Sequence, residues 1–140
     1  MSERLRRQVE SMLRSNGLDW SDTEQGMTLR FDSAIVSIRF TTLGYQSMIQ
    51  VQSNVLLDIP PSAAILAVQA VNELNCATVF GRWAYYVDES VIVLEDDILG
   101  DHLQSPELIT AVASLARLAD YHDDRLKAEL GGLRAIDIPS

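Results

Sequence analysis

The chain has 140 residues, a formal net charge of −9 and a pI near 4.5. A chain of this length forms one domain with a core of its own. The excess of acidic residues opposes binding to nucleic acid, because each phosphate contact requires Lys or Arg. The one cysteine, Cys76, excludes an intrachain disulfide, and only two histidines accompany it. We therefore expect no structural zinc site and no cofactor, and we expect Cys76 to be mostly buried.

The N-terminal segment predicts an amphipathic helix. Ser2 is a candidate N-cap, Asn16-Gly17 supplies a left-handed stop, and apolar residues recur at helical spacing at Leu5, Val9 and Leu13. The arginines of this segment are not followed by the apolar run of a signal peptide. The longest nearly uninterrupted apolar stretch, residues 63–74, is shorter than the roughly 20 residues that a membrane span requires. We expect a cytoplasmic protein that does not contact a membrane.

Alternation of apolar and polar residues then predicts strands that begin near Met27, Val36 and Gln46. The apolar residues of these strands are expected to face a layer of helices. The polar residues that alternate with them are expected to share the outer face of the sheet, and they include Arg30, Arg39, Gln50 and Gln52.

A second helix is predicted from about Pro61 to Asn75, and its apolar residues cover more than half of its circumference. One sheet cannot cover so wide an arc. The helix is therefore either packed between the sheet and the last helix or in contact with a second molecule. Our candidates for a protein-binding or dimer contact on this helix are Leu66, Ala70 and Leu74.

A β-hairpin is predicted between Ala77 and Ile98, because β-branched and aromatic residues flank a polar turn at residues 88–90. Alternation along its first strand places Arg82, Ala84 and Tyr86 on one face and Trp83 and Tyr85 on the other. One face is expected in the core. The other is a candidate recognition surface, which adds Arg82 and Tyr86 to the candidate contact residues, with simple sheet packing as an equal alternative.

The last helix is predicted from Ser105, an N-cap followed by Pro and Glu, to Gly131-Gly132. Its apolar stripe contains Leu108, Val112, Leu115, Ala119, His122, Leu126 and Leu130. The wheel places His122 within this stripe and rotates Asp123 and Asp124 away from it. We expect a hydrogen-bonded histidine at this boundary, and a loosely docked tail over residues 133–140.

A cluster of acidic residues between Glu95 and His102 suggests a different function. Carboxylates suit divalent cations, so Glu95, Asp97, Asp101 and His102 provide an alternative as a small-molecule or metal-dependent enzyme. Because neighbouring strand residues point to opposite faces, Glu95 and Asp97 can converge while Asp96 cannot. The default interpretation is a solvated strand end.

The elements together predict an α+β domain over residues 1–132, in the order α-β-β-β-α-β-β-α, with a twisted, mainly antiparallel sheet covered on one face by helices. A helix ending in Asn-Glu-Leu-Asn, strands containing Phe-Gly-Arg-Trp and Leu-Glu-Asp-Asp, and a long helix finishing at Leu-Gly-Gly resemble the YbjN family. That family shares the fold of type III secretion chaperones. The resemblance implies a chaperone-like architecture that is often dimeric.

The sequence contains no nucleophile with its base, no phosphate-binding glycine loop and no spaced cysteine pair. We therefore predict a non-enzymatic, chaperone-like or regulatory module whose partner is a protein or a second copy of the chain.

Overall fold

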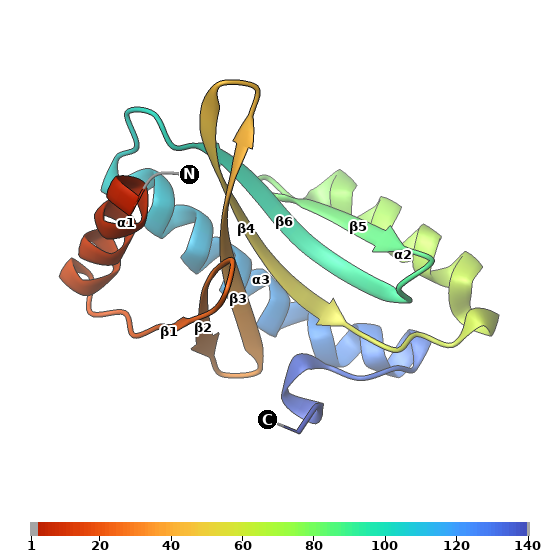
Figure 1. Cartoon of the computed structure of the whole chain (residues 1–140). Helices are drawn as coiled ribbons and strands as arrows, with labels where there is room; N and C mark the ends of the chain where they lie inside the picture. The colour runs from red at the N-terminus through yellow and green to blue at the C-terminus, as the bar shows by residue number, and fades with distance from the viewer. Residues whose placement is uncertain (1–2, 140) are drawn as a thin grey trace.

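A six-stranded antiparallel sheet in the order β1-β2-β3-β4-β6-β5 forms the frame of the molecule in the computed structural model, which describes residues 3–139 (Figure 1). The helices are α1 (Glu3–Ser15), α2 (Ala64–Ala77) and α3 (Ser105–Leu130), with short 3-10 turns η1 (Pro61–Ala63) and η2 (Ala135–Asp137). The strands are β1 (Ser21–Asp22), β2 (Gly26–Phe31), β3 (Ala34–Leu43), β4 (Gln46–Leu56), β5 (Arg82–Tyr86) and β6 (Val91–Leu99). The predicted α+β class and element order are confirmed. Ser2 and Ser140 lie outside the described residues.

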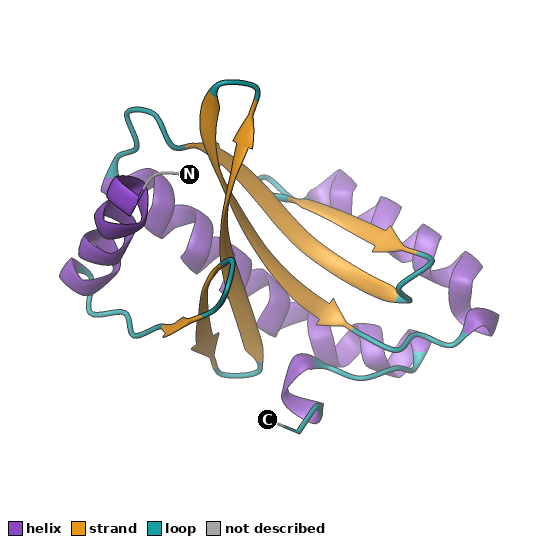
Figure 2. Cartoon of the chain, viewed as in Figure 1, coloured by secondary structure: helices purple, strands orange, loops and turns teal. Residues whose placement is uncertain are grey.

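The strand register places the apolar and the polar residues of the alternating pattern on opposite faces of the sheet. Val51 pairs with Ile38 and both are fully buried, whereas their neighbours Arg39 and Gln50 pair on the opposite face. The same alternation places Arg30 and Gln52 on that face. Helices α1, α2 and α3 lie on the other side of the sheet (Figure 2). We call the face that carries Arg30, Arg39, Gln50 and Gln52 the open face, although C-terminal residues lie beside Arg30 at one end of it.

Two strand predictions require correction. The short edge strand β1 has no alternating pattern and was not predicted. Strand β5 begins at Arg82, and Ala77 belongs to the end of α2. Thr78 is the reason, because its backbone N–H and its hydroxyl both donate to the carbonyl of Leu74, at 2.9 and 2.7 Å, and so cap the helix. Its β-branched shape favours a strand, but it lies at a helix end.

Helix α3 supplies most of the layer that covers the sheet. Its predicted stripe is buried at Leu108, Val112, Leu115, Ala119, Leu126 and Leu130, while His122 is half-buried. The N-cap is Gln104 rather than Ser105. A capping box explains the shift, because the backbone N–H of Gln104 donates to the Glu107 carboxylate at 3.0 Å. Helix α1 adds the buried side chains of Leu5, Val9 and Leu13.

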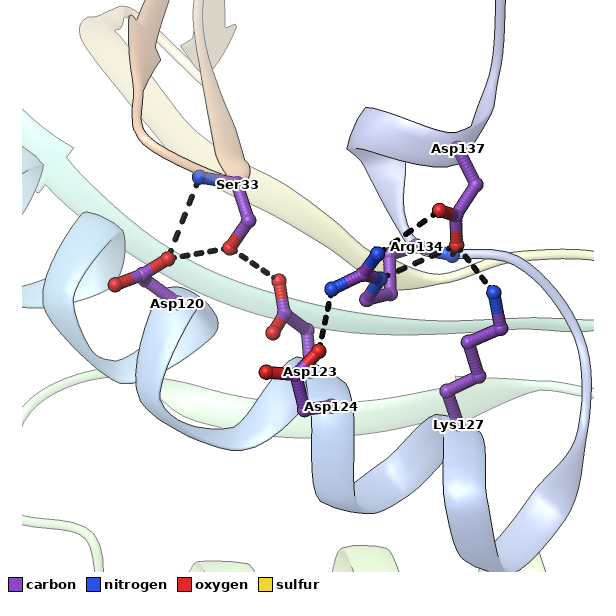
Figure 3. Close-up of polar contacts among 7 residues, drawn as sticks. All are labelled: Ser33, Asp120, Asp123, Asp124, Lys127, Arg134 and Asp137. Atoms are coloured by element: carbon purple, nitrogen blue, oxygen red, sulfur yellow. Dashed lines mark hydrogen bonds and ion pairs between the residues drawn. The ribbon is translucent and has the colours of Figure 1, made fainter.

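The C-terminal segment is fastened to the domain rather than loosely docked. Leu57 and Leu133 exchange backbone hydrogen bonds of 2.7 Å in both directions. Asp137 accepts hydrogen bonds from Lys127 at 2.8 Å and from the Arg134 guanidinium at 3.0 Å. Arg134 also contacts Asp124 of α3 (Figure 3). Ion pairs that the sequence pattern does not reveal therefore hold this segment.

Candidate functional site

Helix α2 leaves a large part of its apolar surface uncovered. Of its residues only Ala67 is fully buried. Ile65, Leu66 and Val68 are 75%, 53% and 58% exposed, and we call these residues the α2 patch. The cause is geometric, because α2 lies over the short edge strand β5 and the sheet does not extend beyond it (Figure 1).

The solvent-facing side of α2 also carries Cys76, which is exposed. The expectation of a mostly buried cysteine is therefore wrong. Cys76 follows Ile65 by eleven residues, about three helical turns, so the two side chains share one face of the helix.

A groove separates the other flank of α2 from α3. Ala70 and Leu74 are half-buried there and point toward α3. Two adjoining hollows of about 200 and 310 Å³ share Leu74, Ala77 and His122 among their lining residues. We define the α2–α3 groove as the surface lined by these hollows, which also includes Ala70, Thr78, Val79, Phe80, Ser114, Leu118 and Leu126.

Aromatic rings connect this groove to the core. The His122 ring lies edge-on to the Trp83 ring at 5.5 Å and to the Tyr121 ring at 4.8 Å. Trp83 is buried, and its indole N–H donates to the Thr78 hydroxyl at 2.9 Å. Burial, assisted by the nearby charge of Arg125, lowers the pKa of His122 below its usual value. His122 therefore acts as a neutral wall of the groove at pH 7.

Four charged residues also line the groove, and their signs balance. Arg117 lines the end near Val79 and Phe80, and Glu73 lines the other hollow together with Arg125 and Glu129. Arg125 and Glu129 form an ion pair of 2.9 Å one helical turn apart. A neutral groove in a chain of net charge −9 favours an apolar partner segment over a strongly charged one.

Arg82 and Tyr86 lie on the opposite, open face of the sheet. Arg82 donates to Asp97 at 2.9 Å and to Glu95 at 3.2 Å, and the Tyr86 hydroxyl donates to Glu95 at 2.7 Å. The bond to Glu95 raises the pKa of Tyr86. These side chains satisfy one another across strands β5 and β6. The predicted contact residues therefore lie on two separate faces, with Leu66, Ala70 and Leu74 on α2 and Arg82 and Tyr86 across the sheet.

Asn75 has a role that sequence reasoning missed. Its side-chain amide accepts a hydrogen bond from the Trp83 N–H at 2.8 Å and donates one to the Trp83 carbonyl at 2.9 Å. A side chain at the end of α2 thus takes the place of a neighbouring strand at the free edge of β5. The available signal was the Asn-Glu-Leu-Asn run, but nothing in it indicates the strand that Asn75 binds.

The acidic cluster does not converge into one site. Glu95 and Asp97 bind Arg82 on the open face, whereas Asp96 pairs with Val51 on the helix-covered face. Asp101 and His102 line a different hollow of about 580 Å³ beside α1. Residues 3–139 contain no group of three or more His, Cys, Asp or Glu placed to hold a metal ion. They also contain no helix that is long and apolar enough to cross a membrane.

The family follows from the sequence. Residues 1–138 match the model of a family described as T3SS (YopN, CesT) and YbjN peptide-binding chaperone 1. The chain belongs to this family. The predicted resemblance to the YbjN family and to type III secretion chaperones is confirmed, and so is the expectation of a chaperone-like, protein-binding module. No curated protein sequence matches the chain.

Solved structures of low sequence identity share the fold of this family member. YbjN from E. coli, described as a putative transcription regulator, matches with a TM-score of 0.60 and 10% identity, covering 87% of this chain and 90% of that one. A chain of the ExsC-ExsE complex matches with a TM-score of 0.62 and 17% identity over 89% and 94%. A chain of the HopA1-SchA chaperone-effector complex matches with a TM-score of 0.54 and 14% identity over 86% and 94%.

Proposed function

We propose that this family member is a non-enzymatic chaperone module that holds an apolar segment of a client protein in the α2–α3 groove. The observation that carries this proposal is the exposure of large apolar side chains at one end of the groove. Val79 is 89% exposed and Phe80 is 50% exposed. They continue the lining formed by Leu74 and Leu118, so a client side chain that entered the groove would meet apolar atoms along its length.

The α2 patch supports a second proposal, that two copies of the chain associate through α2. Ile65, Leu66 and Val68 lie before the groove residues of α2 and face solvent. Burying such side chains yields about 25 cal/mol per Å² of apolar surface. A two-fold contact brings the same patch of both copies together, so each covers the other. The dimer contact and the client groove then use different parts of one helix.

The structural evidence gives no support to the enzyme alternative. A catalytic site would require Glu95, Asp97, Asp101 and His102 in one pocket, but they belong to two separate surfaces. Glu95 and Asp97 both form ion pairs with Arg82. We infer that the protein acts by binding alone. We place it in the cytoplasm, where an exposed free thiol such as Cys76 stays reduced.

Site-specific photocrosslinking in the native cell tests the client proposal. A benzophenone side chain at Val79 is expected to capture client segments, whereas the same group at Gln52 on the open face is the matched control. Capture from Gln52 alone would contradict the proposed location. Identification of the captured segment by mass spectrometry then provides a defined peptide for binding measurements.

Binding of that peptide to groove variants gives the quantitative test. Phe80→Asp places a charge in the apolar groove and is expected to weaken binding by roughly tenfold or more, on the order of 1.4 kcal/mol. The control is Tyr45→Asp, which changes an exposed aromatic residue in the turn between β3 and β4. Equal affinity of both variants for the peptide would rule out the groove as its binding site.

A further inference from the structure

Asp123 is a buried acidic residue on a helix face that was expected to be polar. Its exposed fraction is 3%, although the helical wheel rotates it away from the apolar stripe. The β2–β3 turn covers it, and Ser33 of that turn places its Oγ 2.5 Å from the Asp123 Oδ2 atom (Figure 3). The other oxygen, Oδ1, is buried with no hydrogen-bond partner within residues 3–139. Burying an ionised carboxylate in such surroundings is costly.

The Ser33 hydroxyl contacts a second carboxyl group as well. Its Oγ lies within hydrogen-bond distance of Asp120 Oδ1, and the Ser33 backbone N–H donates to the same atom at 3.3 Å. We call Ser33, Asp120 and Asp123 the Ser33 bridge. A hydroxyl carries one proton and can donate only one hydrogen bond. If both carboxyl groups were ionised, one of these two oxygen–oxygen contacts would contain no proton.

The two carboxyl groups are not equivalent. Asp120 is exposed, and it also accepts the hydrogen bond from the Ser33 backbone N–H. Asp123 is buried, and desolvation raises its pKa despite the bond to Ser33. Among the charged groups facing Asp123, Asp120 and Asp124 of α3 oppose a negative charge. Arg134 of the C-terminal segment favours one, but its guanidinium is bound to Asp124 and Asp137.

We propose that Asp123 keeps its proton at pH values where an ordinary aspartate is ionised, and that it donates this proton to Ser33 while Ser33 donates to Asp120. The Ser33 bridge is then a proton-dependent connection between the β2–β3 hairpin and α3. Loss of the Asp123 proton places two anions on one hydroxyl, so the connection weakens as pH rises. Its contribution to stability is complete below the unfolded-state pKa of about 3.9 and is lost as pH rises through the higher folded-state pKa.

Titration of the Asp123 carboxyl carbon by NMR tests this directly. A midpoint above the ordinary aspartate value of about 3.9 is expected for Asp123, because the buried carboxyl group resists ionisation. A midpoint at or below the ordinary value would overturn the proposal.

Hydrogen exchange provides a structural readout with matched variants. Asp123→Asn supplies an N–H donor to Ser33 at every pH, so backbone exchange in residues 26–43 should be slower in this variant than in the wild type above the Asp123 midpoint. Asp32→Asn removes an exposed acid from the same turn and should behave like the wild type. Equal exchange in all three proteins across this pH range would overturn the proposal. Stabilisation of the wild type by Ca²⁺ or Mg²⁺, absent in Asp123→Asn, would also overturn it, because the bridge would then hold a cation.

Discussion

The two flanks of α3 attach their neighbours in different ways. On one flank, Ser33 and Arg134 fasten the β2–β3 hairpin and the C-terminal segment through hydrogen bonds and ion pairs (Figure 3). On the other flank, α2 meets α3 across the apolar lining of a groove. Polar bonds have preferred directions and fix one geometry, whereas apolar contact is non-directional and can be exchanged for contact with another apolar surface. One flank of α3 therefore fixes the domain, whereas the other flank carries the groove that we propose as the client site.

The largest expected effect comes from removing the aromatic side chain that joins the groove to the sheet. Trp83→Ala deletes a buried ring in contact with His122 and leaves the Thr78 hydroxyl without its donor. We expect a loss of about 3–5 kcal/mol in the free energy of unfolding, measured by chemical denaturation. Tyr45→Ala removes an exposed ring and is the control. If the Trp83→Ala protein is as stable as this control, the contacts of Trp83 with His122 and Thr78 do not contribute to stability.

Asn75→Ala tests the polar bond that attaches α2 to the free edge of β5. The substitution leaves the N–H and carbonyl of Trp83 without their partner, which is expected to cost about 1–3 kcal/mol. The control is Asn72→Ala, one turn earlier on the exposed side of α2. If both variants unfold at the same denaturant concentration, the Asn75 hydrogen bonds contribute nothing measurable to stability. Apolar packing alone then holds α2 against the sheet.

The ion pairs of Asp137 on the polar flank of α3 should make stability depend on pH. Hydrogen bonds from Arg134 and Lys127 lower the pKa of Asp137 below its usual range. Its contribution is therefore present above the unfolded-state pKa of about 3.9 and is lost as pH falls. We expect Asp137→Asn to lower the melting temperature at pH 7. The difference in melting temperature between this variant and the wild type should become smaller as the pH falls. Asp123→Asn should show the opposite trend, because its melting temperature relative to the wild type should increase as the pH rises. A gap for Asp137→Asn that is independent of pH would contradict this assignment.

Most of the fold could be predicted because its signals are local. The spacing of Leu108, Val112 and Leu115 follows the helical repeat, and alternation at Ile38 and Val51 follows the strand repeat. Thr78 was placed wrongly because its shape favours a strand while its bonds end a helix. The wide apolar arc of α2 indicated a contact surface, but only the position of α3 shows which part of it is a groove.

The remaining features depend on residues far apart in sequence. Asp123 is buried because a turn ninety residues earlier in the chain covers it, and no helical wheel contains that turn. The role of Asn75 can be recognised only when the position of β5 beside it is known. Arg82 and Tyr86 were grouped with the α2 residues because composition identified them as candidates, and only the sheet register places them on the other face. Periodicity identifies a face, but it does not identify what covers that face.

Leu66→Glu should have the smallest effect on stability and the clearest effect on association. Leu66 is 53% exposed in the single chain, so a charged side chain can remain in water and the free energy of unfolding of the monomer should change by no more than about 0.5 kcal/mol. If the α2 patch joins two copies, the introduced charge enters the interface next to the same charge of the second copy, and the two repel each other. Sedimentation should then show a dimer for the wild type and a folded monomer for Leu66→Glu. Ala70→Glu is the companion variant, because Ala70 is half-buried against α3 and its substitution should also destabilise the chain. A wild type that sediments as a monomer at tens of micromolar would refute the dimer, and the α2 patch would then remain free for a client.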